Sequence, residues 1–306
     1  MLKVLFTDLD GTCVHYDWHT FGRVASEPTD RGLFSCTSLD GKQDALLLQL
    51  PPSTSGAQGV ISVETLRLYA ALRQLGVRIV VITGARLVTL LARLPFIPAA
   101  DAFVCEGGGR IFYPAGSSLD CPSAAPLMED MGWRRQQAGA AGPPGQDTVP
   151  PEQRSGGLWR FYGALKAQAP QLHVDAVSYT TAFRVKGRED AVAAALSVLP
   201  EGLTTALNLG AADVFPLTSG KENAAAYLMQ RMTVAPSECA FLCDDDNDLG
   251  LAHLVAKAYL PGITAASVAA AVERSPERFH VATSKGVFAT EEVLRLLIAQ
   301  QLAVHK

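Results

Sequence analysis

Two aspartates, Asp8 and Asp10, stand one residue apart in the stretch FTDLDGTC at residues 6 to 13. They follow a short apolar run that predicts a buried strand ending at the carboxylates. A carboxylate placed there can attack the phosphorus of a phosphate ester and carry the phosphoryl group as an acyl phosphate. The leaving alcohol needs a proton and the attacking water must lose one, which suits a second carboxylate. We therefore expect Asp8 to be a nucleophile and Asp10 a general acid and base; a plain turn at the strand end is the alternative.

Two further strands are expected to end in polar residues. Thr83 and Arg86 follow the apolar run VRIVVI, and the acidic stretch at 244 to 248 follows CAFLC. Because ligands gather at the carboxyl ends of parallel strands, these side chains could share one crevice with Asp8 and Asp10. The alternative for the acidic stretch is a solvated turn.

A phosphate site needs positive charge and hydrogen-bond donors beside its carboxylates. A dianionic phosphate among several carboxylates calls for a hard cation, and Mg²⁺ with oxygen ligands from Asp244 and Asp248 is the expected one. The hydroxyl of Thr83 and the ammonium of Lys221 would supply donors to the phosphoryl oxygens. Thr83 as a helix cap and Lys221 as a solvated lysine at a helix start are the alternatives.

Strands and helices are expected to alternate along most of the chain. A helix over residues 63 to 76 between strands at 3 to 10 and 77 to 86 forms a βαβ unit. Later, GKENAAAYLMQRM predicts a helix, CAFLCDDDND a strand that runs into acids, and DLGLAHLVA another helix. This alternation indicates an α/β fold.

Four motifs in this order resemble those of the haloacid dehalogenase (HAD) superfamily of phosphohydrolases. They are DLDGT at 8 to 12, ITGAR at 82 to 86, Lys221 in TSGKENAAAYL, and CDDDNDLGL at 243 to 251. The resemblance implies a doubly wound, parallel-sheet, Rossmann-like α/β core with an inserted α+β cap domain. It also implies a nucleophilic Asp8 and an acid/base Asp10, with Mg²⁺ held by the Asp8 side chain, the Asp10 carbonyl, Asp244 and, mostly through water, Asp248. By the same resemblance we expect phosphate binding by Thr83, Gly84 and Lys221, supported by Thr12, Arg86 and Asn247.

The fourth motif departs from the family pattern in two ways. Cys243 stands where the family has Gly, and it is expected to be a buried small residue rather than a nucleophile. Three consecutive acids, residues 244 to 246, leave the ligand register open by one residue, and Asn247 with Asp248 places it at Asp244.

The cap domain is expected over residues 110 to 211, as in the sugar-phosphatase-like branch of the family, and the core over 1 to 109 and 212 to 306. Within the cap, GLWRFYGALKAQ and EDAVAAALSVL predict helices, and TTAFRVK predicts a strand. Residues 134 to 157 are rich in Gly, Pro, Gln and Ala and predict an exposed, mobile loop. Residues 17 to 59 form an insertion to which we assign no chemical role, and we expect it to contain one strand and a turn.

Composition limits the classes of partner. The chain has 306 residues with 26 basic and 30 acidic side chains, a net charge of −4, and no basic tract that would bind nucleic acid. Its six cysteines lack the spacing of a metal site and fit a reducing compartment. No apolar run approaches the roughly 20 residues of a membrane span, and no signal peptide is expected ahead of the first strand. We expect a soluble, cytoplasmic protein whose oligomeric state stays open.

These observations predict a Mg²⁺-dependent phosphomonoesterase that hydrolyses a small phosphorylated metabolite, with a sugar phosphate as the favoured substrate. A catalytically silent phosphate-binding or scaffold protein is the alternative from another class, and Cys243 and the unexplained insertion motivate it. A sugar phosphomutase, in which the aspartyl phosphate returns to a sugar, is a third possibility.

Overall fold

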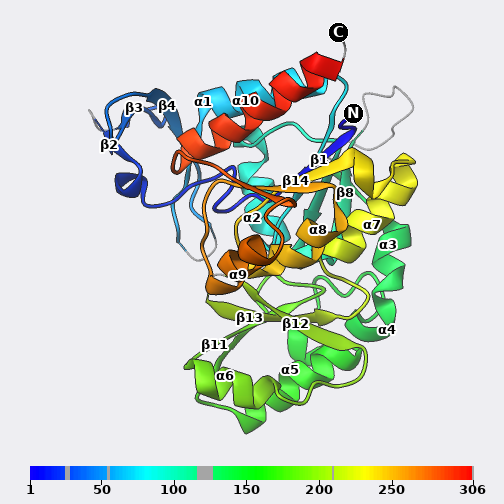
Figure 1. Cartoon of the computed structure of the whole chain (residues 1–306). Coiled ribbons are helices and arrows are strands. Elements are labelled where there is room, and N and C mark those ends of the chain that lie inside the picture. The colour runs from blue at the N-terminus through cyan, green and yellow to red at the C-terminus, as the bar shows by residue number, and fades with distance from the viewer. Residues whose placement is uncertain (25–27, 54–55, 116–126, 209, 305–306) are drawn as a thin grey trace. The chain divides into compact units, whose positions relative to one another are not determined.

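The computed structural model describes residues 1–24, 28–53, 56–115, 127–208 and 210–304 (Figure 1). The chain divides into two compact units. The first comprises Met1–Ile82, Val88–Asp101 and Met229–Lys306, and the second comprises Thr83–Leu87 and Ala102–Leu228. The division into a core at 1 to 109 and 212 to 306 and a cap at 110 to 211 stays a prediction.

A parallel sheet forms the centre of the first unit and confirms the α/β fold class. Five of the sheet's strands belong to this unit, and every neighbouring pair among them is parallel. Across the sheet the strands are β16 (Phe279–Val281), β15 (Lys257–Leu260), β14 (Cys239–Leu242), β1 (Val4–Thr7) and β6 (Arg78–Ile82).

The expected βαβ unit is present, and its sequence explains its bounds. All four residues of β1 are buried, as is typical of a strand covered on both faces. The helix α1 (Val63–Gln74) begins after Ser62, whose hydroxyl accepts the Glu64 amide at 3.1 Å. It ends before Gly76, whose positive φ of 81° suits the residue after a helix.

The order of the strands reverses between β1 and β14. From β1 the chain continues to β6 on one side of it, whereas β14 pairs with the other side and leads outward to β15 and β16. In open α/β sheets such a switch point, at the carboxyl ends of the strands, is where ligands bind. Asp8 directly follows β1, and Asp244 follows β14 by two residues.

Helices of the first unit accompany this sheet, and the last of them, α10, runs beside α1 (Figure 1). The helices at 248 to 256 and 220 to 232 predicted from the sequence are confirmed as α8 and α7. The helices of the first unit besides α1 are α2 (Leu87–Arg93), α8 (Leu249–Leu254), α9 (Ala266–Arg274) and α10 (Val287–Val304), and α7 (Lys221–Met232) begins in the second unit and ends in the first.

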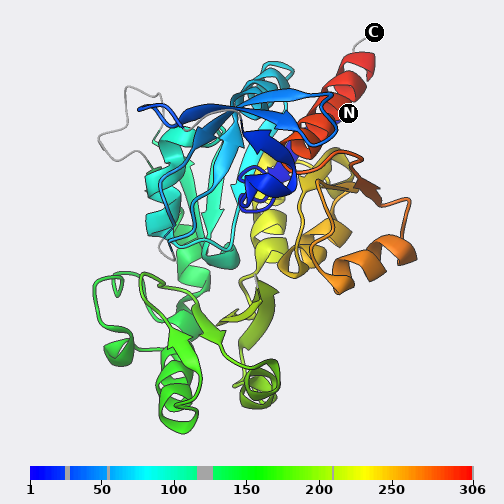
Figure 2. The ribbon, with the colours of Figure 1, turned by 90° about the vertical axis from the view of Figure 1, so that its left-hand side faces the viewer.

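The insertion at 17 to 59 contains more regular structure than the expected strand and turn. It supplies three strands of a four-stranded antiparallel sheet (Figure 2). Phe34 and Leu47 from this sheet, with Phe21 just before β2, pack against Phe288 of α10 and form a separate apolar core. The strands are β2 (Gly22–Val24), β3 (Leu33–Ser38), β4 (Asp44–Gln49) and β5 (Val60–Ser62).

The second unit contains two groups of antiparallel strands. The first group consists of β7 (Ala102–Cys105), β8 (Arg110–Pro114) and β9 (Leu127–Glu129). The second is a four-stranded sheet in the order β10 (His173–Asp175), β11 (Phe183–Lys186), β13 (Ala211–Pro216) and β12 (Leu203–Asn208). The helices α5 (Gly157–Gln168) and α6 (Glu189–Leu196) pack on one face of this sheet through a shared apolar core. Both helices and the strand β11 agree with the sequence predictions for this region.

The prediction of an exposed loop over residues 134 to 157 fails for residues 134 to 141, whereas residues 142 to 156 contain no α-helix or strand and most of them are exposed or half-buried. This stretch holds the second half of α3 (Met131–Gln136) and all of α4 (Ala138–Ala141), and Arg134 and Ala141 are buried. The small residues of α4 let the indole of Trp159 approach closely enough to donate to the Ala141 carbonyl at 2.8 Å. A composition poor in large apolar residues therefore still gives a packed segment. Its mobility stays a prediction.

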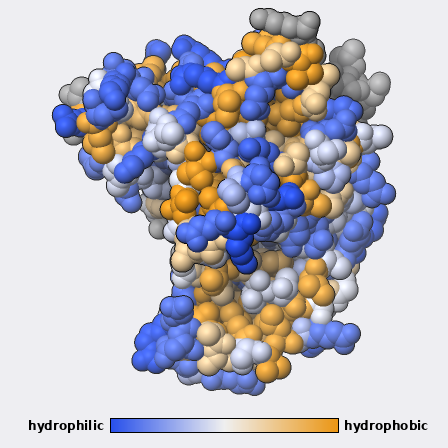
Figure 3. Space-filling view, in the orientation of Figure 1, coloured by the Kyte–Doolittle hydropathy of each residue, from blue (hydrophilic) through white to orange (hydrophobic). Residues whose placement is uncertain are grey.

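The surface of the molecule is largely polar on the face in Figure 3. The hydrophilic cluster at the lower left of that view lies over the start of α6, where Lys186, Arg188, Glu189 and Asp190 are exposed. Among the described residues, no helix combines the length and the apolar character that crossing a membrane would require.

A buried histidine ties the segment after the first motif to α10 and predicts a pH dependence of stability. The His15 Nε2 lies 2.9 Å from the Thr290 hydroxyl, which donates to the Thr12 carbonyl and so accepts from the imidazole. Burial lowers the pKa of His15 from 6.5 to about 4. Between these two values the unfolded chain binds the extra proton, so stability falls as the pH falls.

We expect this one group to remove about 2 to 3 kcal/mol of unfolding free energy between pH 7 and pH 4.5. Urea unfolding at both pH values measures it. The loss of unfolding free energy between the two pH values should be smaller in His15→Gln than in the wild type, and the difference should be that amount. The control His173→Gln, at an exposed histidine, should behave as the wild type. Equal pH dependence in His15→Gln and the wild type would refute this prediction.

Candidate active site

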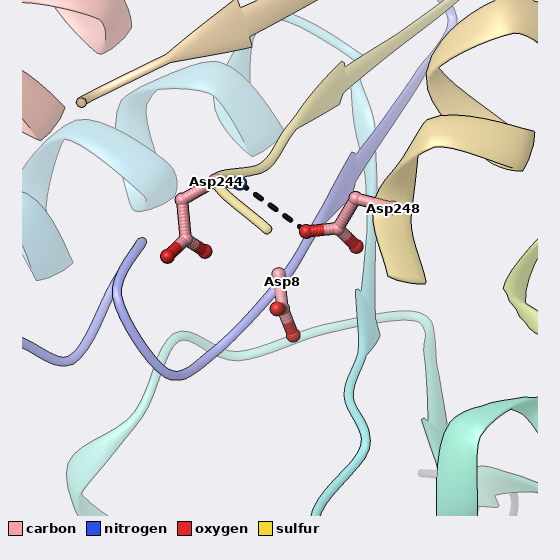
Figure 4. Close-up of side chains that lie close together, drawn as sticks. All are labelled: Asp8, Asp244 and Asp248. Atoms are coloured by element: carbon pink, nitrogen blue, oxygen red, sulfur yellow. Dashed lines mark hydrogen bonds between the residues drawn. The ribbon is translucent and has the colours of Figure 1, made fainter. Parts of the chain in front are cut away.

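Three carboxylates meet at the switch point of the first unit, and Figure 4 shows their arrangement. One oxygen each from Asp8, Asp244 and Asp248 lies within 4.8 Å of the other two, and all three residues are buried. Asp8 comes from the end of β1, and the other two come from the turn that follows β14. Like charges held this close in a buried place repel unless a cation or protons compensate them.

Asp244 is held by several contacts from the first motif and its surroundings. The Thr12 hydroxyl donates to Asp244 Oδ1 at 2.9 Å, and the Thr264 hydroxyl donates to the Asp244 carbonyl. Gly11 lies against the same carboxylate with a φ of +81°, and a Cβ there would stand 2.1 Å from Asp244 Oδ2. Gly11 and Thr12 of the first motif therefore fix the position of the Asp244 carboxylate from the fourth motif.

The carboxylate of Asp248 stabilises the turn formed by residues 244 to 248. Its Oδ2 accepts the backbone amides of Asp244 and Asp245, each at 3.2 Å (Figure 4 draws the first). The cluster contains Asp244 and neither Asp245 nor Asp246, which agrees with the ligand register expected from the sequence. Asn247 Oδ1 is buried without a hydrogen-bond partner among the described residues. An unpartnered acceptor oxygen in the turn that carries Asp244 and Asp248 suits a hard divalent cation with oxygen ligands.

Two cysteines near these acids are structural. Cys243 is buried, as expected, and its amide continues the strand pairing by donating to the Tyr259 carbonyl at 3.0 Å. Burial raises the pKa of the Cys13 thiol to about 12, so it stays protonated at neutral pH beside the hydroxyls of Thr7 and Tyr69. Cys13 therefore lacks the ionised thiol of a nucleophile.

Asp10 lies outside the three-carboxylate cluster and has its own partners. The guanidinium of Arg93, at the end of α2, donates to Asp10 Oδ1 at 2.6 Å, and the Tyr16 hydroxyl donates to the same oxygen. Burial and the charge of Asp10 raise the pKa of Tyr16, so its hydroxyl stays protonated. Sequence reasoning missed Arg93 and Tyr16 because each stands alone in its segment, without a motif or a spacing that points to Asp10.

The remaining residues predicted from the motifs belong to the second unit. The Thr83 hydroxyl is buried and accepts the Ala85 amide at 3.1 Å, so it closes the turn before α2. Lys221 is buried at the start of α7, which excludes a solvated lysine. Arg86 pairs with Asp175 and lies over the ring of Tyr179 at 4.7 Å. Phosphate binding by Thr83, Gly84 and Lys221 stays a prediction, as does the supporting role of Arg86.

Comparison with known proteins finds likeness at the level of structure. No family model and no curated protein matches the sequence. The sucrose-phosphatase from Synechocystis, solved with sucrose and phosphate, matches with a TM-score of 0.62 and 15% identity over 98% of each chain. A HAD-superfamily phosphatase from Bacteroides thetaiotaomicron matches with a TM-score of 0.58 and 13% identity over 97% of this chain and 94% of that one. The sugar phosphatase BT4131 of HAD subclass IIB matches with a TM-score of 0.56 and 13% identity over 97% and 98%.

The chain therefore has the fold of the HAD superfamily, with a mostly parallel core sheet and a separate antiparallel sheet. Within that class, its full-length matches give it the sugar-phosphatase-like fold of subclass IIB.

The tight contact at Gly11 predicts that even one methyl group there damages the site. In Gly11→Ala the new Cβ must displace Asp244, and we expect divalent-cation affinity to fall about 10- to 100-fold. The left-handed backbone adds a strain of about 1 to 2 kcal/mol. Gly76→Ala is the matched control, because Gly76 has the same φ of 81° and nothing within 4 Å of its Cβ position.

Calorimetric titration with Mg²⁺ and urea unfolding separate the two effects. The control should lose stability and keep wild-type affinity, whereas Gly11→Ala should lose both. Wild-type Mg²⁺ affinity in Gly11→Ala would contradict the steric account of the site.

Proposed function

We propose that this protein is a Mg²⁺-dependent phosphomonoesterase that hydrolyses a small phosphorylated metabolite through an aspartyl phosphate on Asp8. The observation that carries the proposal is the buried cluster of Asp8, Asp244 and Asp248 at the switch point of the parallel sheet. In a HAD-like fold, three carboxylates at this place suit a cation and a phosphate ester better than a structural role.

The donor set fits Mg²⁺, and in our proposal the carboxylates of Asp8 and Asp244, the Asp10 carbonyl and Asp248 hold it. When bound, the ion would offset the charge of the phosphate and of the carboxylates around it. The side-chain Oδ1 of Asp8 is fixed by the Leu9 amide at 2.7 Å, so the carboxylate keeps one orientation.

In the first step, a carboxylate oxygen of Asp8 forms a bond to phosphorus as the bond between phosphorus and the ester oxygen breaks. The proton of Asp10 passes to the departing oxygen, which leaves as an alcohol. In the second step, Asp10 takes a proton from water, whose oxygen attacks the same phosphorus. The bond from phosphorus to Asp8 breaks, and both carboxylates return to their starting states with inorganic phosphate released.

A polar row in the second unit supports a hydroxyl-rich substrate such as a sugar phosphate. Arg184 alternates with Phe183 and Val185, which face the helices, so it lies on the other face of the sheet. Its guanidinium forms two hydrogen bonds to Asp213, at 2.6 and 2.7 Å, and Asp175 is its register partner on β10. Charged groups held in place by such hydrogen bonds make strong, directed hydrogen bonds to hydroxyls.

The test is a panel of phosphorylated metabolites, incubated with the protein and Mg²⁺ and assayed for free phosphate. We expect release from at least one class of ester, with sugar phosphates ahead of phosphorylated amino acids and nucleotides. Transfer between positions of a sugar without phosphate release would indicate a mutase. Silence across the panel would contradict the proposal and favour a phosphate-binding scaffold.

A further inference from the structure

The partner of Asp10 is a fully buried cation. Arg93 has a relative exposure of 0%, and its guanidinium forms an ion pair with Asp10 at 2.6 Å. Its second terminal nitrogen donates to the Tyr16 hydroxyl at 2.9 Å, and its Nε has no partner among the described residues. A buried guanidinium is costly to desolvate, and only well-aligned partners offset that cost. The pair of Arg93 and Asp10 is therefore expected to keep one geometry.

The three groups form a closed ring of hydrogen bonds around one oxygen. Arg93 donates to Asp10 Oδ1 and to Tyr16, and Tyr16 donates to the same Oδ1. Among the described residues, Asp10 Oδ2 receives no hydrogen bond, and the side chain is 18% exposed. One oxygen of the carboxylate is thus anchored by two donors, while the other stays open.

This asymmetry matters for a group that must exchange protons. An oxygen that already accepts two donor hydrogens is a poor place for a third, so the carboxyl proton belongs on Oδ2. A proton held on one known oxygen, aimed in one direction, transfers efficiently, because acid–base catalysis depends on geometry before it depends on acidity.

We infer that Arg93 and Tyr16 are positioning residues that anchor Asp10 Oδ1, so that Oδ2 alone gives the proton to the leaving group and takes it from water. The inference rests on the proposed phosphatase function. It adds two residues from outside the four motifs: one from the segment leading into the insertion and one from the end of α2.

The experiment separates the two chemical steps by the choice of substrate. An alkyl phosphate needs a proton on its leaving oxygen, whereas an activated aryl phosphate leaves without one. Tyr16→Phe removes one donor and keeps the packing of the ring. We expect its turnover of an alkyl phosphate to fall about tenfold, while the burst rate on an aryl phosphate stays within about twofold of the wild type.

A misdirected Asp10 should also slow the attack of water on the aspartyl phosphate. Intact-protein mass spectrometry of quenched steady-state samples should therefore show more phosphorylated protein in Tyr16→Phe than in the wild type. Tyr259→Phe is the matched control, since it removes the hydroxyl of another buried tyrosine, which contacts Gln300 at 3.3 Å. It should match the wild type in both measurements.

A double-mutant cycle shows whether Tyr16 acts through Asp10. If it does, adding Tyr16→Phe to Asp10→Asn should cost no further activity. Arg93→Lys, which keeps the charge and loses the planar fork, should show the same pattern with a loss of about 100-fold, provided that it folds. Tyr16→Phe tests the inference even where Arg93→Lys does not fold.

Equal losses on the alkyl and aryl esters, or additive losses in the cycle, would overturn the inference and leave the phosphatase proposal intact. A wild-type protein that releases no phosphate from any ester would overturn the proposed function, and this inference with it.

Discussion

Replacing Asp8 with asparagine is expected to reduce phosphate release on the order of 10⁴-fold or more, because the amide keeps the shape of the side chain and lacks its nucleophilic oxygen. The fold should survive this change. Asp8 is one of three buried acids in close contact, so loss of its charge relieves repulsion in the absence of metal. The thermal midpoint of the metal-free variant should equal or exceed that of the wild type.

Steady-state phosphate release with a sugar phosphate and an aryl phosphate measures the loss. Asp30→Asn, which makes the same chemical change at an exposed position, is the matched control and should keep full activity. Turnover by Asp8→Asn above about 1% of the wild-type value, with the aryl ester as substrate, would show that another group attacks phosphorus.

Removal of the divalent cation should abolish activity, which is the second large effect. We expect a chelator to stop phosphate release, Mg²⁺ to restore it, and Ca²⁺ to fail. Because Ca²⁺ takes six to eight oxygen ligands at longer distances, it should draw both Asp8 oxygens to itself and block the attack. Full activity in the presence of chelator would contradict the metal assignment.

A binding measurement without turnover checks the same site. Mg²⁺ should raise the unfolding midpoint of the wild type, since a ligand that binds only the folded state stabilises it. Asp244→Asn should lose most of this rise. Asp245→Asn, at a neighbouring acid outside the cluster, should keep it.

The sequence led to the three-carboxylate cluster because each of its members sits in a motif at a strand end. The sequence placed Asp8 and Asp244 at the ends of two strands, and the structure shows that these strands, β1 and β14, are parallel neighbours. Asn247 and Asp248 also placed the register at Asp244, and in the structure Asp244, rather than Asp245 or Asp246, belongs to the cluster.

The sequence did not lead to Arg93 or Tyr16. Arg93 is the last residue of a short helix, where an arginine is usually exposed. Only the structure shows that its side chain is buried. Tyr16 stands just before the insertion, and no repeating pattern in that segment predicts that its hydroxyl contacts Asp10. Contacts made by single residues far apart in sequence leave no local pattern to read.

The insertion and the segment after α3 were difficult for a related reason. The strand β2 has three residues, too few for an alternating pattern, and its antiparallel partner β3 begins only at Leu33. The residues of α4 are Ala and Gly, whose packing comes from close backbone approach rather than from apolar side chains. Neither the pairing of such a short strand nor close backbone packing can be predicted from periodicity or composition.

The most direct test of the account is a rapid-mix measurement on Asp10→Asn with an activated aryl phosphate. Transfer to Asp8 needs no proton from Asp10 in this case, whereas hydrolysis of the aspartyl phosphate does need it as a base. Absorbance should show a burst of aryl alcohol approaching one equivalent per active site, followed by slow turnover. Turnover of a sugar phosphate should fall roughly 10²- to 10⁴-fold. Mass spectrometry of the quenched protein should find a phosphate-sized increase on the peptide that contains Asp8, and Asp8→Asn should show neither burst nor increase. Wild-type turnover by Asp10→Asn with no trapped phosphate would contradict the account.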